Sequence, residues 1–261
     1  MNRLSSKLVE LKNSNQKALV AYLVAGDPDL DTTLELMHLF VESGVDVIEI
    51  GVPFTDPIAE GPTIQKAHDR ALKNDISLKM ILDLVKKFRT VDQETPIVLM
   101  GYLNTFISHI DLVKSADSNS VDSILVVDVP GELNLETYVI SNPNINTISL
   151  ISPTTKEDRV ESIAKNSTGF IYYVNLRGVT GSSNLNIDEI QKKIARIQQY
   201  TDLPTMAGFG IKSIEDAKTL AACSDGIVIG SSIVEMIDEE STTKEFGRIS
   251  KYLREMKTAI S

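Results

Sequence analysis

Two carboxylates that lie close together in the sequence have the types and setting for acid–base chemistry. Glu49 lies inside an otherwise apolar run, residues 45–51, and Glu60 lies in the loop rich in Pro and Gly that follows. A carboxylate inside an apolar strand is costly unless it is partnered or used. Two acids in different surroundings can divide proton donation and proton acceptance between them. The structural alternative is a salt-bridged strand Glu and a solvated loop acid, and the residues alone leave both interpretations open.

Three later loops are rich in small residues and predict an anion-binding site. They are Arg177-Gly-Val-Thr-Gly-Ser-Ser183, Gly208-Phe-Gly210 and Gly230-Ser-Ser232. Glycine lets the backbone approach a ligand closely, and a helix that begins near Ser231 would present free N–H groups to a phosphate. Glycines also make ordinary turns, but the pairing of the last two loops favours phosphate binding.

Other kinds of chemistry leave little trace in the sequence. It contains no GxxxxGK[ST] phosphate loop and no GxSxG nucleophile motif, and Gly208-Phe-Gly-Ile-Lys-Ser lacks the third glycine of a dinucleotide fingerprint. The three histidines, His38, His68 and His109, lie far apart. None has metal-ligand spacing with the single cysteine, Cys223. We therefore expect no metal site, no serine chemistry and no metal-assisted hydrolysis.

Short apolar runs rich in β-branched residues predict the strands that must position these groups. The runs are Ala18–Val24, Val45–Gly51, Pro96–Tyr102, Ser123–Pro130, Thr147–Ile151, Gly169–Asn175, Pro204–Gly210 and Gly226–Gly230. Continuous apolarity is typical of parallel strands covered on both faces. Amphipathic stretches between them predict helices over 31–44, 63–72, 77–89, 187–199, 213–220 and 244–257, with Ser213 as an N-cap. This alternation favours a (β/α)8 TIM barrel, with extra N-terminal and loop helices, over an open doubly wound sheet.

Length and composition set outer limits. With 261 residues and 42% hydrophobic side chains, the chain can build one large core, so we expect a single domain over residues 1–261. The net charge of −10 argues against nucleic acid and anionic membranes as partners. The sequence contains no apolar run of membrane-spanning length, and its single cysteine fits a reducing compartment. We therefore expect a cytoplasmic protein.

In a barrel of this kind, the loops after the carboxyl ends of the strands form the active face. Glu49 lies at such an end and Glu60 lies just beyond it, while Tyr102 and Asn104 follow the third predicted strand. Asp128 lies near the end of the fourth. For Asp128 we favour a supporting role, because an Asp followed by Val-Pro can hold a neighbouring backbone N–H group.

Taken in order, these motifs closely resemble those of the tryptophan synthase α subunit family. The resemblance extends from Ala21 to Val234, and its most specific stretch is Glu49-Ile-Gly-Val-Pro-Phe-Thr-Asp-Pro-Ile-Ala-Glu-Gly-Pro-Thr-Ile-Gln65. It implies a (β/α)8 barrel that cleaves indole-3-glycerol phosphate into indole and glyceraldehyde 3-phosphate without a cofactor of its own. It also implies an αββα complex in which indole passes to a β subunit that contains pyridoxal phosphate.

The resemblance also implies roles for individual residues. Glu49 would serve as the catalytic acid and base, and Glu60 occupies the position of the second catalytic acid, which contacts the indole N–H. The implied substrate-binding residues are Tyr22, Met100, Tyr102, Leu125, Val127, Ile151, Tyr172, Thr180, Gly181, Phe209, Gly210, Gly230 and Ser231. The implied contacts with the β subunit are Pro53, Phe54, Asp56, Pro57 and Asn104.

The chain departs from the family pattern at the second acid, where Glu60 replaces the usual Asp. The extra methylene would displace the carboxylate unless the loop adjusts, and an error of about 1 Å can cost on the order of 100-fold in rate. We expect the loop to adjust; the alternative is a pseudoenzyme that only activates the β subunit. A phosphate-binding barrel with another substrate is the competing class of enzyme. Tyr22 stands where Phe is usual and Val127 where Ala is common, which predicts a tighter and more polar pocket.

Overall fold

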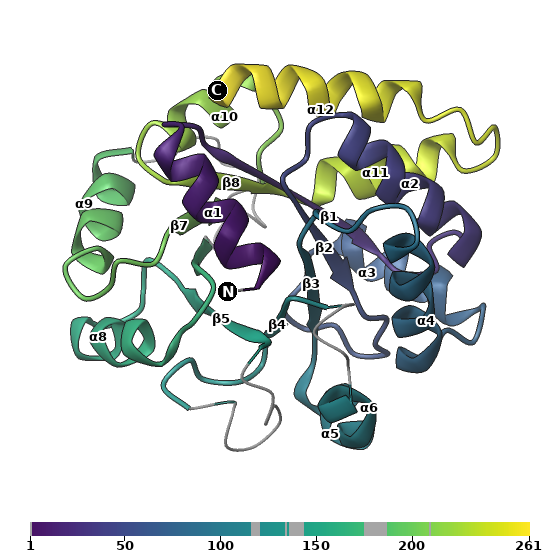
Figure 1. Ribbon diagram of the computed structural model, residues 1–261, viewed down its shortest axis with the longest axis horizontal. Coiled ribbons are helices and arrows are strands. Elements are labelled where there is room, and N and C mark those ends of the chain that lie inside the picture. The colour runs from purple at the N-terminus through teal and green to yellow at the C-terminus, as the bar shows by residue number, and fades with distance from the viewer. Residues whose placement is uncertain (1, 116–120, 134, 136–143, 175–186, 209) are drawn as a thin grey trace.

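Eight parallel strands close into a barrel in the order of the sequence (Figure 1). The computed structural model describes residues 2–115, 121–133, 135, 144–174, 187–208 and 210–261. The strands are β1 (Ala18–Val24), β2 (Val47–Gly51), β3 (Ile97–Gly101), β4 (Ser123–Val126), β5 (Asn146–Ile151), β6 (Ile171–Val174), β7 (Thr205–Gly208) and β8 (Gly226–Ile229). Because β8 pairs with β1 as well as with β7, the sheet has no free edge, and the predicted (β/α)8 barrel is confirmed.

Helices surround this barrel (Figure 1). They are α1 (Arg3–Asn13), α2 (Leu30–Glu42), α3 (Pro62–Leu72), α4 (Leu78–Arg89), α5 (Leu103–Ser108), α6 (Ile110–Ser115), α8 (Glu157–Asn166), α9 (Ile187–Ile197), α10 (Ile214–Ala221), α11 (Ser231–Glu240) and α12 (Gly247–Ile260). Ser213 caps α10 with a reciprocal bond to Asp216, as predicted. The helix predicted from Asp31 begins at Leu30, because the Asp29 side chain accepts the Thr32 N–H and caps it.

Side chains alternate along each strand between the barrel interior and the outer layer under the helices. The interior cluster contains Leu4, Leu8, Leu11, Ala18, Val20, Val47, Val98, Leu125, Ile148, Phe170, Met206 and Val228. On β2, Val47 belongs to the interior cluster and Ile48 to the outer one. Since the alternation has a period of two, Glu49 and Gly51 also face the interior. The strand thus aims a carboxyl group into the barrel.

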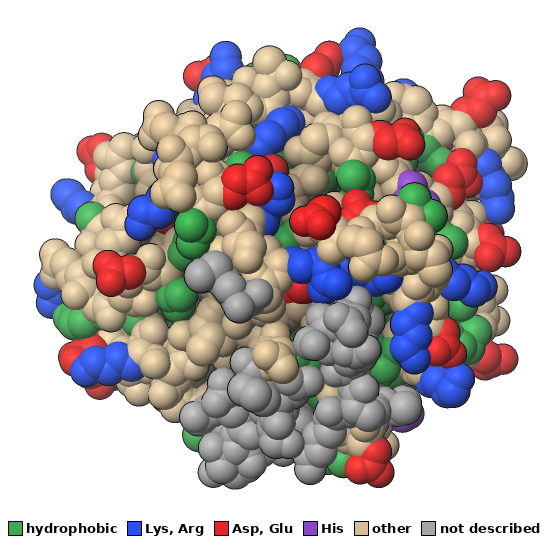
Figure 2. Space-filling view, in the orientation of Figure 1, with side chains coloured by type: hydrophobic (Ala, Val, Ile, Leu, Met, Phe, Trp, Pro, Cys, Tyr) green, Lys and Arg blue, Asp and Glu red, His purple; other side chains and the backbone are tan. Residues whose placement is uncertain are grey.

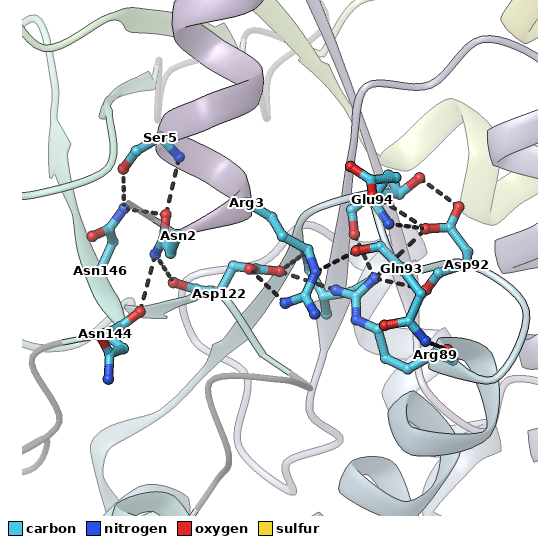
Figure 3. Close-up of polar contacts among 12 residues, drawn as sticks. Asn2, Arg3, Ser5, Arg89, Asp92, Gln93, Glu94, Asp122, Asn144 and Asn146 are labelled. Carbon is cyan, nitrogen blue, oxygen red and sulfur yellow. Dashed lines mark hydrogen bonds and ion pairs between the residues drawn. The ribbon is translucent and has the colours of Figure 1, made fainter.

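Helix α1 lies across one open end of the barrel (Figure 1). Close to its first turn, the Asn2 side chain donates hydrogen bonds to the backbone oxygens of Asp122 and Asn144, at 2.8 and 3.1 Å (Figure 3). The buried Asp122 carboxylate pairs with Arg3 at 3.2 Å and with Arg89 at 3.0 Å. These bonds join the helix to the segments that precede β4 and β5. The amino-terminal end of the barrel is therefore closed, and the opposite end is left for a site.

Acidic and basic side chains are interspersed on the face of the molecule around α1 (Figure 2). Among the described residues of that face, this mixture leaves no extended basic surface of the kind that binds nucleic acid, in keeping with the net charge of −10. Within the described ranges, no helix is both long and apolar enough to cross a membrane.

Candidate active site

Glu49 is the most deeply buried carboxyl group at the open end of the barrel. It lies on β2 with 1% of its surface exposed. Its Oε1 atom has no hydrogen-bond partner among the described residues. Burial, together with the nearby charge of Glu60, raises the pKa of Glu49 to about 8. A carboxyl group with that pKa is largely protonated at neutral pH and can both give and take a proton, as a general acid–base group must.

Glu60 lies in the loop between β2 and α3, where Tyr102 holds its carboxylate. The Tyr102 hydroxyl donates a hydrogen bond to Glu60 Oε2 and accepts one from the Ala59 backbone N–H at 3.0 Å. Burial raises the pKa of Glu60 to about 7, although the bond from Tyr102 acts to lower it. The longer side chain of Glu therefore has a defined partner at the site, and the pKa values of both acids are raised towards neutral pH.

Helix α3 holds the loop that carries Glu60. The His68 ring on α3 accepts the Phe54 backbone N–H at its Nδ1 atom, at 3.0 Å, and the Gln65 amide donates to the Glu60 backbone oxygen at 2.9 Å. The Phe54 ring stacks on the Tyr102 ring with their centroids 4.7 Å apart. Burial lowers the pKa of His68 to about 4, so its ring is neutral. Sequence reasoning assigned no role to His68 or Gln65, because their partners depend on how the loop folds back.

Two tyrosines enter the barrel interior over glycines of neighbouring strands. Tyr22 is 2% exposed and pairs in register with Glu49. A Cβ atom placed on Gly51 would lie 2.2 Å from the Tyr22 hydroxyl oxygen, and one on Gly208 would lie 2.4 Å from the Tyr172 ring. Any side chain at these two glycines would collide with the rings. Glycine at the ends of β2 and β7 thus makes room for the walls of the pocket.

The other expected pocket residues fall into three groups. Leu125 belongs to the interior cluster, and Met100 and Val127 pack against it at the open end. Ile151 is fully buried in the outer cluster instead, because the residues of β5 that contribute to the interior are Ile148 and Leu150. The structure thus separates Ile151 from the expected lining. The remaining expected residues, Thr180, Gly181 and Phe209, lie outside the described residues.

The proposed phosphate end lies where β7 and β8 lead into their helices. Helix α11 begins at Ser231 after Gly230, as the sequence predicted, and no side chain of the described residues caps it. Gly210 is exposed with a φ of +63°, and a Cβ atom there would have no atom of the described residues within 4 Å. The Ser232 hydroxyl donates to the Ile211 backbone oxygen at 2.8 Å, which joins the two loops. Uncapped N–H groups and an open glycine loop are what a phosphate needs.

The expected β-subunit contacts lie on the loops that follow β2 and β3. Asp56 and Asn104 are exposed, Phe54 and Pro57 are partly exposed, and Pro53 is buried. Three large apolar side chains that sequence reasoning did not single out lie on the loops and helix after β2, β3 and β4. They are Ile58, Ile107 and Leu133, with exposed fractions of 73%, 49% and 47%. Because these strands are neighbours in the barrel, the three side chains lie on the same end of the molecule.

The supporting role predicted for Asp128 is confirmed. Its carboxylate accepts the Leu103 backbone N–H at 2.8 Å, at the start of α5. β4 ends at Val126 rather than at the predicted Pro130, and Asp128 makes this contact beyond the end of the strand. The described part of the chain contains no cluster of three or more His, Cys, Asp or Glu side chains that could hold a metal ion.

Glu49 should make the stability of the protein depend on pH. The pKa of its carboxyl is about 8 when folded, against an ordinary value of 4.5. The folded state therefore binds this proton more tightly, so the stabilisation is complete below pH 4.5 and is lost as the pH rises through 8. Glu49→Gln keeps the shape without the charge. It should be more stable than the wild type, on the order of a few kcal/mol, at about pH 9 and nearly equal at about pH 5.

Urea unfolding of both proteins at the two pH values measures this difference. Glu35→Gln removes an exposed carboxylate on α2 and serves as the matched control. A stability difference between Glu49→Gln and the wild type that does not change with pH would contradict the assignment.

The closed barrel places the protein among the (β/α)8 barrels, and the carboxyl groups at the carboxyl ends of its strands are suited to acid–base chemistry. A family model for the tryptophan synthase alpha chain matches residues 8–261. The chain is 42% identical over 263 residues to a tryptophan synthase alpha chain of Nitrosomonas europaea, with 100% of this chain and 96% of that one covered. It is 45% identical over 247 residues to one of Neisseria meningitidis serogroup B, with 94% of each covered.

Solved structures agree with these relatives. The crystal structure of tryptophan synthase subunit alpha from Legionella pneumophila str. Paris matches with a TM-score of 0.90 at 37% identity, covering 100% of this chain and 98% of that chain. The chain therefore belongs to the tryptophan synthase alpha chain family. It is a carbon–carbon lyase of tryptophan biosynthesis that acts on indole-3-glycerol phosphate.

Proposed function

We propose that Glu49 carries the proton transfers of this cleavage. In its protonated form it delivers a proton to C3 of the indole ring, which gives an indolenine. The resulting carboxylate then takes the proton of the hydroxyl on the adjacent carbon of the glycerol chain. The bond between C3 and that carbon breaks, its electrons restore the aromatic ring, and the hydroxyl carbon becomes the aldehyde. Glu49 ends protonated, as it began, so the chain needs no cofactor for the reaction.

Glu60 is the second acid in this proposal. Its carboxylate accepts the indole N–H and stabilises the positive charge that develops when C3 is protonated. The observation that carries the proposal is the buried Glu49, unpartnered at Oε1, with its pKa raised to about 8 partly by the charge of Glu60. Two nearby acids in different surroundings, one buried without a partner at Oε1 and one held by Tyr102, fit this division of roles.

The rest of the substrate extends between the interior wall and the two glycine loops. We assign the indole to the wall formed by Tyr22, Met100, Tyr102, Leu125, Val127 and Tyr172, and the phosphate to Gly210, Gly230 and Ser231. The family resemblance adds Thr180, Gly181 and Phe209. The residues 1–261 would act as a single barrel domain, and we infer a cytoplasmic enzyme.

A negative charge at Gly210 should weaken phosphate binding. Gly210→Asp places a carboxylate in the open space beside the loop, where it repels the phosphate, and we expect the dissociation constant to rise by about 10-fold or more. Gly210→Ala is the matched control, because it introduces the same strain at a φ of +63° without the charge. Titration with indole-3-glycerol phosphate in a Glu49→Gln background measures the dissociation constant for each variant. Equal increases for Gly210→Ala and Gly210→Asp would show that backbone strain, and not the added charge, weakens binding.

We further propose that the open end of the barrel docks a tryptophan synthase β subunit, which would carry the pyridoxal phosphate. Ile58, Ile107 and Leu133 are large, exposed apolar side chains on the segments that follow β2, β3 and β4, and Ile58 lies in the loop that carries Glu60. An apolar surface at the mouth of a site is suited to a partner that receives its product. Docking would hold Glu60 in place, so the β subunit should raise indole formation.

One experiment tests the function and the partner together. Indole release from indole-3-glycerol phosphate is measured with and without the cognate β subunit, and association is followed by sedimentation. Ile58→Asp should lose the association, with stimulation reduced by about 10-fold or more, because it buries a charge in the interface. Val91→Asp, at a position 76% exposed before β3, is the control that should associate normally. Stimulation of the β subunit without any indole release would identify a pseudoenzyme instead.

A further inference from the structure

Two buried polar atoms at the open end of the barrel have no hydrogen-bond partner among the described residues. They are the hydroxyl oxygen of Tyr22 and Oε1 of Glu49. The two residues are register partners on β1 and β2, and both point into the barrel. A buried hydroxyl or carboxyl group that lacks a partner is destabilising, so such a pair calls for an occupant that satisfies both groups.

The Tyr22 ring lies between two glycines at the carboxyl ends of neighbouring strands, Gly230 after β8 and Gly51 on β2. A Cβ atom on Gly230 would lie 3.4 Å from Cδ1 of the ring, and one on Gly51 would lie 2.2 Å from the hydroxyl oxygen. The ring thus runs from the loop assigned to the phosphate to the end of β2, where Glu49 lies. Its hydroxyl lies at the β2 end of this span, next to the strand that carries Glu49.

The chemistry of the two atoms identifies the group that fits them. Tyr22 offers an O–H donor, and an ionised Glu49 is an acceptor only. A ligand hydroxyl can accept from the first and donate to the second at the same time. An apolar group would satisfy neither atom, and an N–H group would satisfy only Glu49. Among the groups of the proposed substrate, a chain hydroxyl is therefore the one that can satisfy both atoms at once.

We propose that the Tyr22 hydroxyl is a catalytic hydrogen-bond donor to the substrate hydroxyl from which Glu49 removes the proton. This assignment rests on the function proposed above. As that proton passes to Glu49 and the carbon–carbon bond breaks, the oxygen becomes the aldehyde oxygen, and Tyr22 holds it while keeping its own proton. Burial and the charges of Glu60 and Glu49 raise the pKa of Tyr22 well above its usual value, which keeps the hydroxyl protonated.

Two ligands distinguish a Tyr22 hydroxyl that donates a hydrogen bond to the substrate from a Tyr22 ring that only packs against it. Indole-3-glycerol phosphate carries the chain hydroxyls, whereas 3-(indol-3-yl)propyl phosphate has the same ring and phosphate without them. Both affinities are measured in a Glu49→Gln background, which prevents turnover. There, Tyr22→Phe should lower the affinity for indole-3-glycerol phosphate about 10- to 100-fold and change the affinity for the propyl phosphate by less than about twofold. With Glu49 intact, Tyr22→Phe should lower kcat more than it raises KM.

A second tyrosine of the barrel serves as the control in the same measurements. Tyr173→Phe makes the same change on the outer face of β6 and should leave both affinities and kcat unchanged. Tyr22→Phe itself should melt no lower than the wild type, since it removes a buried hydroxyl without a partner. Equal weakening of both ligands, or an unchanged kcat, would overturn the Tyr22 assignment alone. Failure of the otherwise unchanged protein to bind either ligand would overturn the proposed function and this assignment with it.

Discussion

Replacing Glu49 by glutamine is expected to lower the turnover of indole-3-glycerol phosphate by about 10²- to 10⁴-fold, the usual contribution of a general acid–base group. Glutamine fills the same volume but can neither deliver a proton to C3 nor take one from the chain hydroxyl. The phosphate loops after β7 and β8 are untouched by the change. The affinity for 3-(indol-3-yl)propyl phosphate should therefore stay within about threefold of the wild type.

Steady-state indole release with the β subunit present, together with calorimetric titration of the propyl phosphate, measures the two quantities. Glu49→Gln should remain folded, because it also removes the cost of a buried charge. Near-normal indole production by this variant would refute the role of Glu49. A loss of binding equal to the loss of turnover would instead make Glu49 a binding residue.

The second large effect is expected at Glu60. Glu60→Ala removes the group that stabilises charge on the indole nitrogen and should cost about 100-fold or more in turnover. Glu60→Asp keeps the charge but shortens the side chain, so its carboxylate should fall short of Tyr102 and turnover should drop by about 10- to 100-fold. Because the pKa of Glu60 is raised to about 7, wild-type kcat/KM should fall as the pH is lowered through 7 and the carboxylate is protonated.

A double-mutant cycle with Tyr102→Phe tests why the longer acid works in this chain. The Tyr102 hydroxyl donates to Glu60 and is itself held by the Ala59 N–H. If this contact positions the carboxylate, Glu60→Asp should cost less in the Tyr102→Phe background than in the wild type. If Glu60→Asp lowers turnover by the same factor in both backgrounds, the Tyr102 hydroxyl does not position Glu60. A wild type with turnover at background level, below that of Glu60→Asp, would identify a degenerate site.

Much of the fold follows from local patterns that the sequence displays directly. A run such as Ala18–Val24 is apolar throughout, and the strand occupies those same residues. The start of α10 was predicted from its capping residue Ser213, and the helix predicted over 77–89 is α4, in which Ser77 is the N-cap and the helix begins at Leu78. Strand ends were predicted less well. The run Ser123–Pro130 continues past Val126, but the strand ends there, and the Asp128 carboxylate instead accepts the N–H of Leu103, 25 positions earlier in the chain.

The sequence by itself also determined the order of elements, the presence of a carboxyl group in an apolar strand, and the glycines before α11, because each of these depends on neighbours within a few positions. The tertiary structure alone decided that the Tyr22 hydroxyl points toward Gly51 beside Glu49, that Tyr102 holds Glu60, and that Ile151 packs outward. These outcomes depend on the register between strands and on how loops fold back over the barrel. Register is set by packing among residues distant in sequence, and a shift of one residue would exchange the two faces of a strand.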